Sequence, residues 1–146
     1  MWAQLLGGVL ISLVNFTIHA ICTAVVVYAT RHMARVTSER GLLVRLLALL
    51  TVTMVSLMIA HVAEIGIWTA YYIHVGLVVS NASPFEFAFE NYTALGYGDA
   101  VPGEGSRLLG PITALNGLLL VGWSVAIIFE VMRMAELQFG YRAKRD

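Results

Sequence analysis

Charged residues are scarce in this sequence, and so are cysteine and proline. Only 12% of the 146 residues are charged, 59% are hydrophobic, and the mean hydropathy is +0.80. A soluble domain of this size normally carries about twice that share of charge, because its surface is large relative to its volume. The composition excludes an ordinary soluble domain and indicates a protein of the lipid bilayer.

Further absences narrow the functional classes. The single cysteine, Cys22, cannot form an intrachain disulfide, and the net charge of zero implies no nucleic-acid partner. The sequence has no Ser/His/Asp, Cys/His, paired-carboxylate or phosphate-loop arrangement. We therefore expect neither an enzyme nor a bound cofactor. No apolar run carries arginines at every third position, as a voltage sensor would.

Three long apolar runs predict an all-α membrane protein with three transmembrane helices. The first, Leu5 to Thr30, contains no Lys, Arg, Asp or Glu and can cross a ~30 Å hydrocarbon core. It follows no basic leader region, so we expect it to be retained as a helix. The second run extends from near Leu42 almost to Val79, longer than one span, and the third from about Arg107 to Met134.

The segment from Ser80 to Gly105 is different. Its short run Phe85 to Tyr92 cannot span a bilayer, but Pro84 suits the first turn of a half-helix. Irregular backbone at membrane depth is tolerated only where protein or water buries it. The segment therefore predicts a re-entrant loop between the last two spans.

Basic residues predict the orientation. Eight of the nine lie around the first connection or near the C-terminal tail: Arg31, Arg35, Arg40, Arg45, Arg133, Arg142, Lys144 and Arg145. Three spans place these two regions on one side, which the positive-inside rule assigns to the cytoplasm. We expect the N-terminus and the re-entrant loop outside, in the cell membrane of a bacterium.

The residues after the half-helix suit an ion filter. Such filters replace the water around a cation with rings of backbone carbonyls. Consecutive carbonyls point the same way only if alternate residues adopt conformations forbidden to most side chains, which Gly96 and Gly98 permit. Tyr97, between them, is expected to pack outward and brace the loop.

The run Thr93-Ala94-Leu95-Gly96-Tyr97-Gly98-Asp99 resembles the filter signature T-V-G-Y-G-D of the potassium-channel pore family. The resemblance covers roughly Leu42 to Met134 and implies a homotetramer that conducts K⁺ passively. It divides the chain into an additional helix and loop (1–40), a pore domain (41–135) and a basic tail (136–146). It also implies K⁺ bound by the carbonyls of Ala94, Leu95, Gly96 and Tyr97, with Gly98 in the filter.

The same resemblance assigns supporting residues. Thr93 and Asp99 flank the filter, and Glu90 lies where several family members have a glutamate that pairs with the filter aspartate. Two such carboxylates are expected to share a proton or a bridging water. Candidate hinge and gate residues in the last helix are Gly117, Gly122 and Phe129, although helix packing explains these glycines nearly as well.

One departure leaves the function open. The family has Thr where this chain has Ala94, and that hydroxyl normally completes the innermost ion site. A weakly selective cation channel, or a non-conducting accessory subunit with a degenerate pore, are therefore alternatives to a K⁺ channel.

Polar residues inside the spans are further candidates. His61 and Glu64 share one face of the second helix and suit either a proton sensor or a structural pair. Asn15 and His19 are expected to bond the second helix. Counted from the cytoplasmic helix ends, His19 and His61 differ in depth by ~10 Å, which argues against haem between them.

Overall fold

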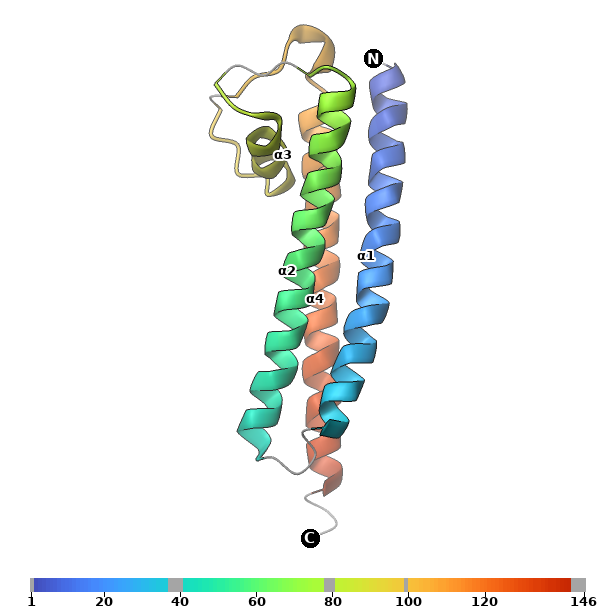
Figure 1. Ribbon diagram of the computed structural model, residues 1–146, viewed down its shortest axis with the longest axis vertical. Coiled ribbons are helices and arrows are strands. Elements are labelled where there is room, and N and C mark those ends of the chain that lie inside the picture. Colours follow the sequence, from blue (N-terminus) through green and yellow to red (C-terminus); the bar gives the residue numbers. More distant parts are fainter. Residues whose placement is uncertain (1, 37–40, 78–80, 99, 143–146) are drawn as a thin grey trace.

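Three long helices and one short helix make up the part of the chain that the structure describes. The computed structural model describes residues 2–36, 41–77, 81–98 and 100–142. The long helices lie side by side, and the short helix packs against the second and third of them near one end (Figure 1). In chain order the elements are α1 (Trp2–Val36), α2 (Leu42–His74), α3 (Pro84–Tyr92), a 3₁₀ turn (Glu104–Ser106) and α4 (Leu109–Arg142).

Each long helix is apolar and long enough to cross a membrane. The candidate spans are Gln4–Met33, Leu43–His74 and Leu109–Ala135, and most of their residues are not buried within the chain. This confirms the predicted all-α membrane fold with three transmembrane helices.

The helix bounds differ from the predicted ones in three places. α1 continues past Thr30 to Val36, and α4 continues past Met134 to Arg142. α2 ends at His74, short of the predicted Val79. The helix ends here because Gly76 has φ +65°. In this conformation the N–H groups of Gly76 and of the next residue donate to carbonyls in the last turn of α2. The sequence that follows is nevertheless apolar.

The described basic residues near the C-terminal ends of α1 and α4 lie at the same end of the molecule, as the charge distribution predicted. The N-terminus and the connection between α2 and α4 lie at one end (Figure 1). The C-terminal end of α1 and the N-terminal end of α2 lie at the other, with the C-terminal end of α4. Arg31 and Arg35, in the last turns of α1, are therefore at the same end as Arg142.

α3 is the predicted half-helix, and Pro84 is its first residue. Ser83 caps it: the Ser83 hydroxyl accepts from the Glu86 N–H, and the Glu86 carboxylate accepts from the Ser83 N–H at 2.6 Å. These hydrogen bonds from Ser83 lower the pKa of the exposed Glu86 carboxyl. The capping box fixes where the half-helix begins.

Two glycines of α4 let α3 approach closely. Gly110 and Gly117 are seven residues apart and therefore share one face of the helix. A Cβ on Gly117 would lie 1.9 Å from the carbonyl oxygen of Tyr92, and one on Gly110 would lie 2.6 Å from Oδ1 of Asn91. The C-terminal half of α3 thus rests directly on α4.

The aromatic residues near the end of α2 belong to the core between the helices. Trp68 and Tyr72 are fully buried. Trp68 Nε1 donates to Asn116 Oδ1 at 2.9 Å, and the Tyr72 ring lies 5.4 Å from the Phe87 ring. The rings are buried because α3 and α4 cover this part of α2.

Candidate functional site

The loop that follows α3 begins with a helix-terminating turn. The Leu95 N–H donates to the Glu90 carbonyl at 2.9 Å, and the Ala94 N–H donates to the Asn91 carbonyl at 2.9 Å. This pair of bonds is a Schellman motif, which requires a left-handed residue just beyond the helix. Ala94 takes that role with φ +55°, although glycine is the usual residue.

Left-handed residues then alternate along the loop. Ala94, Gly96 and Gly98 have φ of +55°, +56° and +83°, whereas Leu95 and Tyr97 do not have positive φ. Such alternation rotates successive peptide planes so that their carbonyls fall on one side instead of two. The geometry expected of the two glycines is present, and it extends to Ala94, where no residue preference predicted it.

Every residue of this loop is exposed in the single chain. The side chains of Leu95 and Tyr97 are 55% and 72% exposed. The Thr93 hydroxyl instead donates back to the Phe89 carbonyl at 2.9 Å, within α3. Glu90 is half-buried, whereas Asp99 lies outside the described residues, so the predicted Glu90–Asp99 pair stays a prediction.

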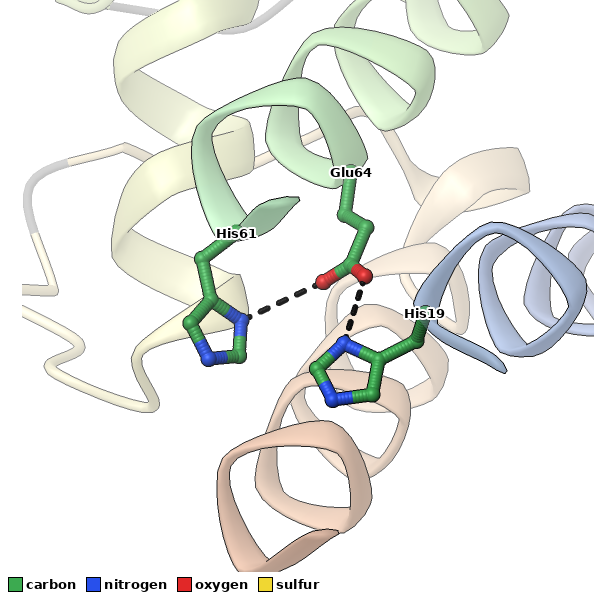
Figure 2. A group of neighbouring side chains, drawn as sticks. All are labelled: His19, His61 and Glu64. Carbon is green, nitrogen blue, oxygen red and sulfur yellow. Dashed lines mark hydrogen bonds and ion pairs between the residues drawn. The ribbon is translucent and has the colours of Figure 1, made fainter. Parts of the chain in front are cut away.

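A second group of polar side chains lies inside the helix bundle. His19 from α1 approaches His61 and Glu64 of α2 (Figure 2). Nδ1 of His19 is 2.8 Å from Glu64 Oε1, and Nδ1 of His61 is 3.2 Å from Glu64 Oε2. The side chains of His19 and Glu64 are completely buried, and that of His61 is 18% exposed.

Two more residues complete this group. The Tyr92 hydroxyl, at the end of α3, donates to Glu64 Oε2 and lies 2.7 Å from Nδ1 of His61. The Ser124 hydroxyl, from α4, lies 2.9 Å from Nε2 of His61 and 3.3 Å from Nε2 of His19. These five residues, here called the buried cluster, connect all four helices. Through Tyr92, the last residue of α3, the cluster lies next to the start of the loop.

The structure brings His19 and His61 to the same depth, contrary to the offset that the sequence suggested. Their ring centroids are 5.4 Å apart. The count from the helix ends was wrong because α1 continues to Val36, which adds ~9 Å at its cytoplasmic end. The expected bond from Asn15 to the second helix is confirmed: its Nδ2 donates to the Glu64 backbone carbonyl at 3.3 Å.

The remaining candidate residues are spread along α4. Gly117 is the position at which α4 contacts Tyr92, whereas nothing lies within 4 Å of a Cβ placed on Gly122. Phe129 is 67% exposed. Arg133 donates two hydrogen bonds of 2.8 Å to Glu130, which joins these two residues as an ion pair near the end of the helix.

A family model described as "Ion channel" matches residues 58–134, more than half of the chain. The chain belongs to this ion-channel family. The match begins within α2, contains α3, the loop at 94–98 and most of α4, and leaves out α1. Ion channels are not enzymes, in agreement with the sequence. No curated protein and no solved structure matches the chain.

Proposed function

We propose that four copies of the chain surround an axis and conduct K⁺ passively through their loops at 94–98. The alternating positive φ at Ala94, Gly96 and Gly98 carries this proposal. With the carbonyls of this stretch on one side, each chain offers a ladder of oxygens that can replace the water around a cation. The resemblance of the run at 93–99 to the potassium-channel signature supports K⁺ as that cation.

Assembly is part of the proposal because one loop cannot enclose an ion. The exposed side chains of Leu95 and Tyr97 are apolar surface that neighbouring copies would cover. Rotational symmetry would also direct the C-terminal ends of four α3 helices toward the axis, where their negative dipole ends favour a cation. The positive-inside rule supports an outward-facing filter, with both basic regions in the cytoplasm.

A second candidate is a weakly selective cation channel, and Ala94 favours it. Without a hydroxyl at this position, the inner end of the filter has carbonyl oxygens only. Purified protein in liposomes distinguishes the candidates: K⁺ flux well above Na⁺ flux supports the proposal, and similar fluxes support the second candidate. Absence of both fluxes would favour a non-conducting subunit.

Replacing Ala94 by threonine should raise the permeability ratio of K⁺ over Na⁺, because it adds an oxygen at the inner end of the filter. A β-branched residue at φ +55° is also strained, so the unfolding free energy should fall by ~1 kcal/mol. Ala94→Val is the matched control, since valine has the same shape without the hydroxyl. Equal reversal potentials in the two variants would show that position 94 supplies no side-chain ligand.

A further inference from the structure

We propose that His19, His61 and Glu64 form a binding site for a divalent transition-metal ion of the Zn²⁺ class. Each side chain offers one ligand atom, and these atoms all lie within 4.8 Å of one another. Two imidazole nitrogens and one carboxylate oxygen are a donor set that Zn²⁺ binds with a fourth position left for water or substrate. The sequence alone suggested no metal other than K⁺.

Side-chain rotations are needed to bring the donor atoms to the spacing of a zinc site. Donors around a tetrahedral zinc ion are roughly 3.4 Å apart, given bonds of about 2.0–2.2 Å. The Glu64 oxygens are now 2.8 and 3.2 Å from the Nδ1 atoms of His19 and His61. These two contacts must lengthen slightly, and donor pairs that lie up to 4.8 Å apart must close by up to about 1.4 Å. The 18% exposure of the His61 side chain opens the cluster on one side.

The residues that hydrogen-bond to the three proposed ligands are of the kind that support metal ligands. A ligating histidine usually donates its other ring N–H to a fixed acceptor, which sets its tautomer. Here the Nε2 atoms of His19 and His61 both approach the one hydroxyl of Ser124, at 3.3 and 2.9 Å. Tyr92 donates to Glu64, as the support of a ligating carboxylate would.

Hydrogen counting shows that one protonation state of the cluster can accept a cation. If both Nδ1 atoms carried the proton, both Nε2 atoms would be acceptors, and the single Ser124 O–H can serve only one of them. If both Nε2 atoms carry the proton, both donate to the Ser124 oxygen, which has two lone pairs. In that state two ring nitrogens and the buried carboxylate of Glu64 face one another as acceptors and can take a cation between them. Without a metal, a mixed arrangement satisfies the same contacts: His61 Nε2–H donates to Ser124, the Ser124 hydroxyl to His19 Nε2, and His19 Nδ1–H to Glu64.

A metal ion at this site would join α1 to α2 directly behind the end of α3. Glu64 bonds Tyr92, and Tyr92 lies two residues before Ala94, where the proposed filter begins. The site therefore connects α1 to the proposed filter through Glu64 and Tyr92. Its metal affinity does not depend on K⁺ selectivity, so either proposal can fail without the other.

Zn²⁺ binding to the purified full-length protein tests the site. After treatment with a chelator, equilibrium dialysis should find one Zn²⁺ per chain, and Co²⁺ in its place should give the intense visible absorption of tetrahedral coordination. Glu64→Gln and His61→Ala should each weaken binding at least ~100-fold, and Ser124→Ala about 10-fold. His74→Ala, which removes an exposed histidine at the end of α2, should leave the affinity unchanged.

Either the wild-type protein or the variants can overturn the proposal. Absence of stoichiometric Zn²⁺ binding, or binding that Glu64→Gln leaves unchanged while His74→Ala removes it, would contradict it. Conduction that depends on pH, in a protein that binds no Zn²⁺, would indicate that the cluster binds a proton instead of a metal ion.

Discussion

Replacing Gly98 by alanine should bring the permeability ratio of K⁺ over Na⁺ close to one, or abolish conduction. Gly98 has φ +83°, and a side chain at such an angle costs roughly 1–2 kcal/mol. The loop can relieve this strain by rotating the peptide, which would turn one carbonyl away from the axis in every copy. Because selectivity requires all ligands of a site at once, a small backbone change has a large effect. The reversal potential under bi-ionic conditions measures it.

Gly103→Ala is the matched control for that experiment. Gly103 lies in the same connection between α3 and α4, and a Cβ added to it would meet nothing within 4 Å. Its φ is −55°, which alanine adopts freely. The Gly103→Ala channel should therefore keep the wild-type permeability ratio. A Gly98→Ala channel that also keeps the wild-type ratio would remove Gly98 from the filter.

Replacing Gly117 by alanine should have the second large effect, a loss of both stability and conduction. The new Cβ would lie 1.9 Å from the Tyr92 carbonyl oxygen, 2.8 Å from its carbonyl carbon and 3.0 Å from its Cα. These are backbone atoms, so α3 itself must move, and overpacking of this kind costs ~1–3 kcal/mol. The movement would displace the start of the loop and the Tyr92 contact with Glu64 together. Thermal unfolding and K⁺ flux measure the two losses.

Gly122→Ala separates packing from bending of α4. Position 122 is exposed and open, so alanine there should stabilise the helix by up to ~1 kcal/mol and leave conduction intact. If Gly122→Ala instead abolishes gating while Gly117→Ala behaves as the wild type, Gly117 does not act by close packing, and a hinge at Gly122 is the better explanation.

The parts of the fold that depend on local chemistry were predictable from the sequence. Pro84 marked the first turn of the half-helix, and Gly96 and Gly98 marked the positions with positive φ. Both follow from what one residue allows its own backbone to do. The end of α2 at Gly76 also follows from what glycine allows its own backbone to do. It was not predicted because apolar residues continue after Gly76.

The buried cluster was only half predictable, because it depends on contacts between distant segments. The spacing of His61 and Glu64 placed them on one face, and His19 was expected to bond the second helix. Nothing in the sequence identified Tyr92 and Ser124 as their partners. Ser124 and His19, for example, are 105 residues apart. The relative depth of residues on two helices depends on where each helix ends. In α1, polar residues continue the helix beyond the apolar run, so the end of the apolar run does not predict the end of the helix.

The central claim is that the carbonyls of Ala94, Leu95, Gly96 and Tyr97 ring K⁺ on a symmetry axis. The most direct measurement is an experimental structure of the purified protein with Tl⁺, a heavy substitute for K⁺, located by its anomalous scattering. Our account predicts four chains around one axis, with Tl⁺ sites on that axis between successive rings of these carbonyls. A stable assembly without a shared axis through residues 94–98, or Tl⁺ bound only elsewhere, would contradict it.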